Sequence, residues 1–191
     1  MDARARRSRD RLSTAVLTLA AHRDAGSVSV AELAREAGVH RSTVYEHADS
    51  PADLLRTVLR DELDLVRQQH LVDVPADGIP AAIRAVTLGV LEHVDTHRAV
   101  YALALGSADD AALHVMLSSH FRESVLLLVE AGAVTVPSEI ADPEVLARFV
   151  ADGTVGAIDA WLRGSDADAP RDPDHFVRAY RALMPAWWPL G

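Results

Sequence analysis

Apolar residues recur along this chain with the three-and-four spacing of amphipathic helices, and no segment sustains the alternation of a strand. Near the N-terminus Leu12, Val16 and Leu19 fall on one face, which predicts a helix over about 3–23. The same spacing predicts further helices near 30–37, 41–47, 51–69, 81–95, 97–105, 109–131, 143–163 and 173–184. The pattern therefore predicts an all-α fold.

Residues that typically begin and end helices agree with this spacing. Ser29 followed by Glu32 forms a capping box at the start of the second helix. Gly38 can adopt the positive φ that the turn after this helix requires. Asp142 and Asp172 each precede a proline, which predicts a cap and a first helical residue for the last two helices.

The segment 73–80 contains two prolines and a glycine and is the expected boundary between two domains. We expect an N-terminal three-helix domain over 1–50, continued by a linking helix over 51–70. The remaining residues, 71–191, form a larger helical body. In the linking helix, Leu65 is expected to face inward with its other leucines.

The distribution of charge separates the same two parts. The net charge is -9, yet residues 1–47 hold eight arginines against six acidic residues, whereas 48–191 hold 11 against 22. A positive end on a negative body can bind phosphate locally. There is no cysteine and no apolar run long enough for a membrane span, and the N-terminus is interpreted as an amphipathic helix rather than an export signal. The default location is the cytoplasm.

The short predicted helix at 41–47 carries side chains suited to duplex DNA. Arg41 can donate two parallel hydrogen bonds to a guanine edge, Thr43 offers a hydroxyl and a methyl, and Ser42 allows close approach. Tyr45 and His47 can bind phosphate oxygens. The plainer alternative is a solvated polar face on an ordinary helix.

Residues outside this helix are expected to assist. Ser29 lies at a helix N-terminus, where phosphate is attracted. Four arginines near the N-terminus are expected to reach the flanking DNA backbone, namely Arg4, Arg6, Arg7 and Arg9. Together these residues predict a helix-turn-helix DNA-binding domain.

A characteristic set of residues lies at 30–34, 37–39, 42–47, Ser50 and 54–55, with a weaker set over 150–164. In these residues the chain resembles the TetR family of transcriptional regulators. The resemblance implies an all-helical homodimer that binds a palindromic operator in double-stranded DNA and dissociates when a small-molecule inducer enters its C-terminal body. It places base contacts on Arg41, Ser42 and Thr43, and phosphate contacts on Tyr45 and His47.

Three positions depart from the family's usual pattern. Ala48 stands where an aromatic residue is usual, and Pro51 stands where a lysine usually contacts phosphate. Ala31 offers no base contact where some relatives carry a long polar side chain. These departures bear on affinity for DNA rather than on the fold.

In the body, small residues such as Gly153 and Gly156 on the 143–163 helix would let another helix approach closely. We expect this helix and 173–184 to form a four-helix bundle with their symmetry mates, covered by Trp187 and Trp188. Packing of the same face within one subunit is the alternative.

Polar residues on apolar helical faces predict a ligand pocket in the body. The candidate ligand-binding residues are Thr87, Tyr101, Met116, His120, Ser124 and Trp161. An ordinary core containing satisfied polar groups is the alternative for each of them.

No cofactor or metal is expected. His93 and His97 share a helical face, but two ligands do not make a metal site and the sequence places no third. The absence of a nucleophile motif or phosphate loop argues against a small helical enzyme. The preferred interpretation is a ligand-responsive repressor. The alternatives are a DNA-binding activator without a ligand, a helical enzyme and an interaction module whose DNA-reading helix has degenerated.

Overall fold

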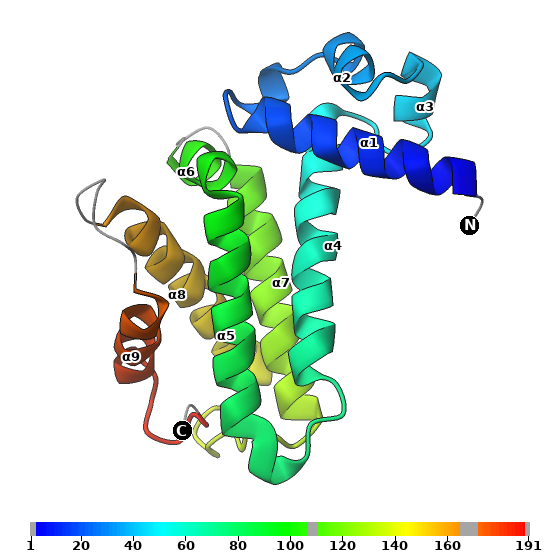
Figure 1. Ribbon diagram of the computed structural model, residues 1–191. Helices are drawn as coiled ribbons and strands as arrows, with labels where there is room; N and C mark the ends of the chain where they lie inside the picture. Colours follow the sequence, from blue (N-terminus) through cyan, green and yellow to red (C-terminus); the bar gives the residue numbers. More distant parts are fainter. Residues whose placement is uncertain (1–2, 107–110, 165–171, 190–191) are drawn as a thin grey trace. The chain divides into compact units, whose positions relative to one another are not determined.

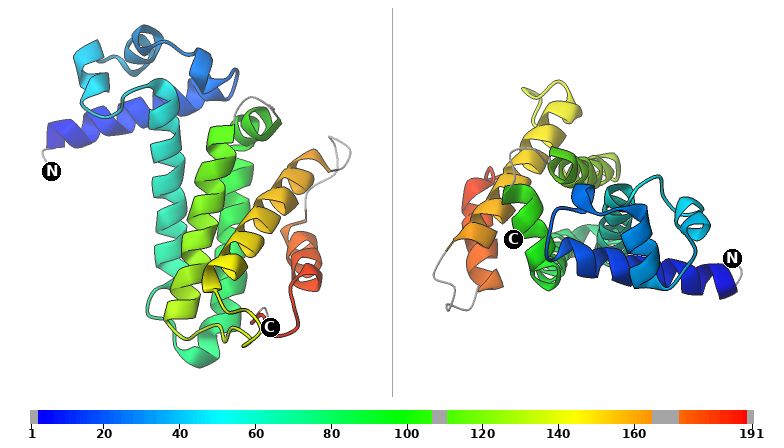
Figure 2. Two further views of the ribbon diagram at one scale, coloured as in Figure 1. Left: turned by 180° about the vertical axis from the view of Figure 1, so that it is seen from behind. Right: turned by 90° about the horizontal axis from the view of Figure 1, so that it is seen from above.

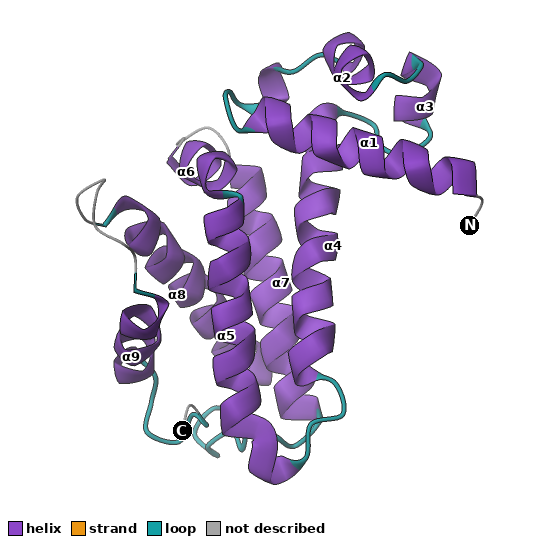
Figure 3. Ribbon diagram, viewed as in Figure 1, coloured by secondary structure: helices purple, strands orange, loops and turns teal. Residues whose placement is uncertain are grey.

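The computed structural model describes residues 3–106, 111–164 and 172–189, and within them it is helical without strands (Figures 1 and 3). The α-helices are α1 (Ala3–Ala20), α2 (Val30–Ala37), α3 (Arg41–Tyr45), α4 (Pro51–Leu71), α5 (Ile79–Thr96), α6 (Arg98–Gly106), α7 (Ala111–Glu130), α8 (Pro143–Arg163) and α9 (Pro173–Leu183). Short 3-10 turns occupy Ala25–Ser27 and Ala76–Gly78. The all-α prediction is confirmed, although the expected start of one helix at 109 lies outside the described residues.

The predicted caps are present. The Ser29 hydroxyl accepts a hydrogen bond from the Glu32 backbone N–H at 3.2 Å, and the Glu32 carboxylate accepts one from the Ser29 N–H at 3.0 Å. Gly38 ends α2 with φ at 62°. Asp142 and Asp172 each accept a bond at 2.9 Å from the backbone N–H two residues later. Local hydrogen bonds thus define where these helices begin and end.

The chain divides into two compact units, and the first comprises Met1–Asp61 and His97–Leu113. It contains α1 to α3, the start of α4, and α6. Helix α2 contacts α1 and α3. The fully buried aliphatic side chains of this first unit are Leu12, Val16, Leu33, Val44 and Leu59. Because burial of each such side chain contributes roughly 1.5–3 kcal/mol, this core holds α3 in place.

The second unit comprises Glu62–Thr96 and His114–Gly191. Within it, α5 and α7 run side by side with the later part of α4, and α8 and α9 complete the unit (Figures 1 and 2). Helices α4 and α5 come close at Gly89, where an added Cβ would lie 2.7 Å from Val66 Cγ1. The domain boundaries expected from the sequence, after residue 50 and at residue 71, stay predictions.

One expected core position is wrong, because Leu65 is 55% exposed while Leu63 is fully buried. Different neighbours bury α4 along its length, so the phase of its first turns does not extend to its last ones. No single helix in the described part is long and apolar enough to cross a membrane, and the bent pair Pro51–Leu71 and Ala76–Thr96 meets that test by length and composition only.

Candidate DNA-binding and ligand sites

Helix α3 is anchored by one side chain and presents the others outward. Val44 is fully buried, whereas Arg41 and Ser42 are exposed and Tyr45 is 62% exposed. Thr43 is half-buried. The polar surface that the sequence predicted for this helix is therefore accessible, apart from the inner edge of Thr43.

His47 follows α3 and is half-buried, just before the buried Ala48. The missing aromatic at Ala48 leaves a methyl group inside the first unit, and Pro51 is the first residue of α4.

Arg9, one of the arginines expected to reach the DNA backbone, forms an ion pair with Asp61. The side chain of Arg4 lies outside the described residues.

The hydroxyl of Ser29 is engaged within the protein. It donates to Glu32 Oε2 at 2.9 Å, and Glu32 Oε1 accepts from Arg23 Nη2 at 2.9 Å. The bond from Arg23, together with those from Ser29, lowers the pKa of Glu32 to about 2. A phosphate contact through the Ser29 hydroxyl would therefore have to replace a bond to an ionised carboxylate.

A surface hollow of about 570 Å³ lies beside α3 in the first unit. Its lining residues are Arg7, Ser8, Asp10, Arg11, Gly38, Val39, His40 and Thr43. Arg11 and His40 were not among the sequence candidates. For Arg11 the signal was its four-residue spacing from Arg7 on α1, which puts both guanidinium groups on one helical face.

The second unit contains a partly open cavity of about 80 Å³. Its walls come from the end of α4, from α5, α7, α8 and α9, and from the segment after α9. The lining residues are Leu71, Ile83, Val86, Thr87, Val90, Leu91, Phe121, Ser124, Val125, Leu128, Val150, Thr154, Ile158, Phe176, Tyr180 and Trp188. Thr87 and Ser124 are the two sequence candidates among them.

The other four candidates are placed elsewhere. Tyr101 is fully buried in the first unit, and Met116 is buried in α7 without lining the cavity. Trp161 packs edge-on against Phe176, a lining residue, with ring centroids 6.0 Å apart, and does not itself line the cavity. His120 also lies away from the cavity lining.

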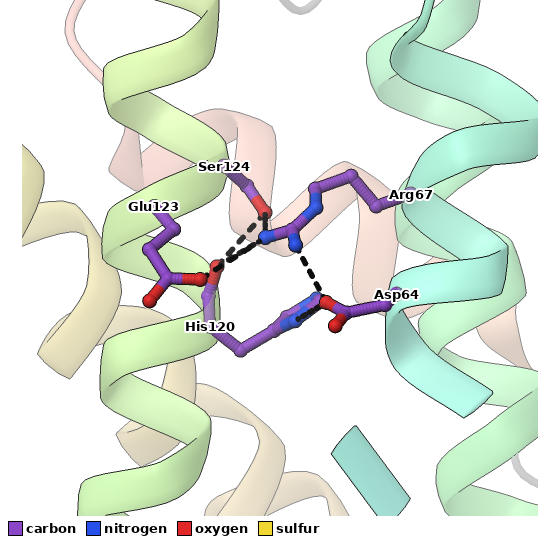
Figure 4. Close-up of polar contacts among 5 residues, drawn as sticks. All are labelled: Asp64, Arg67, His120, Glu123 and Ser124. Carbon is purple, nitrogen blue, oxygen red and sulfur yellow. Dashed lines mark hydrogen bonds and ion pairs between the residues drawn. The ribbon is translucent and has the colours of Figure 1, made fainter. Parts of the chain in front are cut away.

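His120 instead joins a polar cluster between α4 and α7 (Figure 4). Its Nδ1 lies 3.1 Å from Asp64 Oδ1, and Arg67 Nη2 lies 2.6 Å from the same oxygen. Arg67 Nη1 also lies 3.6 Å from Glu123 Oε2 and 3.5 Å from Ser124 Oγ. The cluster ties the second half of α4 to α7.

Burial is the main reason that the pKa of His120 falls from 6.5 to about 4. The positive charge of Arg67 lowers it further, while Asp64 acts in the opposite direction. The imidazole is therefore neutral near pH 7, and its Nδ1–H donates to Asp64.

Several cavity residues were not anticipated. Phe176 and Tyr180 belong to one apolar face of α9, and this face was readable from their four-residue spacing. Trp188, expected over the dimer surface, lines the cavity. Its position depends on the course of the segment after α9, for which the sequence carries no periodic signal.

Helix α8 has an exposed apolar stripe on its outer face. Val145 is 62% and Phe149 70% exposed, and a Cβ added at Gly153 or Gly156 would meet nothing within 4 Å. On α9, Leu183 is 71% exposed. Exposed apolar surface of this kind is typical of protein–protein interfaces.

His93 on α5, one of the two histidines that the sequence places on one helical face, has its Nδ1 3.3 Å from Glu62 Oε2.

A helix-turn-helix unit followed by a separate helical unit with an apolar cavity is the architecture of one-component transcriptional regulators. Two family models match the chain, one for "Bacterial regulatory proteins, tetR family" over residues 14–58 and one for "Transcriptional regulator C-terminal region" over 83–179. The chain belongs to the TetR family of transcriptional regulators, which bind DNA and are not enzymes. No curated protein sequence matches it.

Solved structures share the fold at low identity. A TetR-family regulator from Streptomyces coelicolor has a TM-score of 0.61 at 20% identity, covering 96% of this chain and 85% of that one. The fatty acid degradation regulator FadR from Bacillus halodurans has a TM-score of 0.61 at 16% identity, with 92% and 93% covered. The repressor QsdR from R. erythropolis has a TM-score of 0.54 at 20% identity, with 92% and 93% covered.

Proposed function

We propose that this protein is a homodimeric repressor that binds a palindromic operator and is released by a small-molecule inducer. The observation that carries the DNA-binding part is the outward face of α3, where Arg41, Ser42 and Tyr45 are exposed around the buried anchor Val44. Arg41, Ser42 and Thr43 read bases, and Tyr45, His47 and the backbone near Ser29 contact phosphate.

The exposed stripe on α8 supports the homodimer. Val145 and Phe149 are apolar and largely exposed, and the open surface at Gly153 and Gly156 would admit a second helix at close range. Two symmetric copies would present two α3 helices to successive major grooves, which lie about 34–36 Å apart along one face of the duplex.

The cavity supports regulation by a ligand. Drug-sized ligands usually occupy pockets of about 300–1,000 Å³. At about 80 Å³ this cavity must widen to accept one, and that widening is the kind of movement on which a ligand-driven switch depends. Leu71, the last residue of α4, lines the cavity, and the same uninterrupted helix begins at Pro51 in the first unit.

In this mechanism the ligand displaces the end of α4 and so changes the spacing of the two α3 helices. The coupling must be reciprocal, so operator DNA weakens ligand binding by the same factor by which the ligand weakens operator binding.

The test is selection of bound duplexes from a random DNA pool by the full chain. We expect a palindromic consensus bound as one dimer, with affinity that falls steeply as salt increases because phosphate contacts release counterions. Failure to enrich any sequence at low salt, with the folded protein present, would contradict the proposal. An enriched single half-site would contradict the dimeric mode of binding.

A further inference from the structure

The walls of the cavity bear directly on the chemistry of its ligand. In the described part of the chain, no residue that lines the cavity carries a charged side chain. The polar groups among them are three aliphatic hydroxyls, one phenol and one indole, contributed by Thr87, Ser124, Thr154, Tyr180 and Trp188.

Each aliphatic hydroxyl has only one hydrogen, and each already donates it to a carbonyl of its own helix. Thr87 donates to the Ile83 carbonyl at 2.8 Å, and Ser124 donates to the His120 carbonyl at 2.9 Å. Thr154 donates to its own helix in the same way, at 2.6 Å. The oxygens of these three hydroxyls can therefore accept a hydrogen bond from a ligand, but the hydroxyls have no free hydrogen to donate to it.

Tyr180 is committed in the same way. Its hydroxyl oxygen lies 2.6 Å from Thr154 Oγ1, and because the Thr154 hydrogen is already used, the phenol is the donor. Burial raises the pKa of Tyr180, which keeps the phenol protonated. The Tyr180 hydrogen is thus unavailable to a ligand.

Trp188 is different. Trp188 is 7% exposed, and its buried indole Nε1–H finds no acceptor within the described part of the chain. An indole nitrogen can only donate, and a buried donor without an acceptor destabilises the protein. Among the described residues that line the cavity, Trp188 is the one whose polar side chain has an uncommitted hydrogen. Its nitrogen is closed off from solvent in the ligand-free protein, so a ligand reaches it only as the cavity widens.

A charged ligand finds no oppositely charged side chain among the described residues that line the cavity. Arg67 is the guanidinium that reaches a lining side chain, Ser124, and it is already paired with the carboxylates of Asp64 and Glu123. Burial of an unpaired carboxylate or ammonium group is strongly unfavourable. Size restricts the choice as well, because an apolar cavity of about 150 Å³ accommodates benzene and this one is smaller before it widens.

We propose that the inducer is an uncharged, largely apolar molecule of about one ring in size that accepts a hydrogen bond from Trp188 Nε1. The proposal rests on the proposed ligand-responsive function and identifies the class of ligand for that site. Carboxylates and other ions are excluded from the cavity.

Three probes of similar size test this proposal by calorimetry on the full chain at neutral pH: acetophenone, which has a carbonyl acceptor, ethylbenzene, which lacks it, and benzoate, which is charged. We expect the wild-type protein to bind acetophenone and to reject benzoate. The ratio of acetophenone to ethylbenzene affinity should fall about fivefold in Trp188→Phe, as loss of one net hydrogen bond predicts. Trp187→Phe, which changes the adjacent indole, should leave the ratio unchanged.

A second measurement on the wild-type chain guards against misfolding of the variant. In nitrogen-15 spectra, acetophenone should move the indole N–H resonance of Trp188 downfield, and ethylbenzene should not. An unchanged affinity ratio in folded Trp188→Phe, an unmoved indole resonance, binding of benzoate as tight as that of acetophenone, or binding of none of the probes would each overturn the proposal.

Failure of the two proposals can be told apart. If the ligand-free protein selects no DNA, the proposed repressor function fails, whatever the probes do. If the ligand-free protein selects an operator but the affinity ratio ignores Trp188, the assignment of ligand class fails and the DNA-binding function stands.

Discussion

His120 Nδ1 on α7 lies 3.1 Å from Asp64 Oδ1 on α4, and the histidine side chain is almost completely buried. This pair, with Arg67 bridging to Glu123, makes a polar contact between the two helices. Such a contact fixes the register of α4 against α7, because displacement of either helix leaves buried polar groups unpaired.

The first prediction concerns the pH dependence of stability. The pKa of His120 is about 4 in the folded protein and 6.5 without the fold, so between these values only the unfolded chain binds the proton. The free energy of unfolding should therefore decrease as the pH falls from about 6.5 to 4, by about 1.4 kcal/mol per unit of pKa difference, and should not depend on this group at higher pH.

Urea unfolding at several pH values measures this effect as the difference between wild type and His120→Gln. In the variant, the free energy of unfolding should lose the decrease between pH 6.5 and 4 that this histidine causes. His114→Gln, at an exposed position of the same helix, should retain that decrease. The low pKa of Glu32, about 2, acts below about pH 4.5 and so falls mainly outside this window. Equal slopes in wild type and His120→Gln would contradict the assignment.

The second prediction concerns base reading by α3. Replacement of Arg41 by alanine should cost about 1–3 kcal/mol and relax the preference at one base pair of each half-site. Fluorescence anisotropy with the selected operator and its single-base variants provides the measurement. Tyr45→Phe is the matched comparison, since loss of a phosphate contact should weaken all sequences alike. If Arg41→Ala also weakens all sequences alike, Arg41 contacts only phosphate.

The third prediction concerns the dimer. A carboxylate at position 149, introduced by Phe149→Asp, would be buried without a partner if α8 packs against its symmetry mate. Sedimentation at micromolar concentrations should then show monomers, with a matching loss of operator affinity. Val72→Asp changes a similarly exposed apolar residue outside α8 and α9 and should remain dimeric. A dimeric Phe149→Asp would rule out this face as the interface.

The fourth prediction concerns the close approach of α4 and α5. Gly89→Ala would place its Cβ 2.7 Å from Val66 Cγ1, and a β-branched side chain on a helix has little freedom to move away. The resulting strain should destabilise the protein by about 1–3 kcal/mol, despite the better helix propensity of alanine. Thermal unfolding measures the loss, and the added change Val66→Ala should recover part of it. A Gly89→Ala protein as stable as wild type would show that the helices separate easily.

The cavity of the second unit shows how far the sequence predicts the interior of the body. Thr87 and Ser124 were found because helical periodicity puts them on inward faces, and both line the cavity. The same reasoning selected His120, which faces inward but meets Asp64 instead. Periodicity gives the direction of a side chain relative to its own helix, and it does not give the residue on the helix opposite.

The place of α3 along the chain and the helix boundaries depend on residues a few positions apart: the Ser29 cap and the Gly38 turn act over one or two turns. The sequence alone therefore determined them, together with the family. The meeting of His120 with Asp64, the exposure of Leu65 and the place of Trp188 in the cavity wall depend on how distant helices pack and on the path of a non-helical segment. Only the tertiary structure decided these, because packing is a property of surfaces brought together from remote parts of the chain.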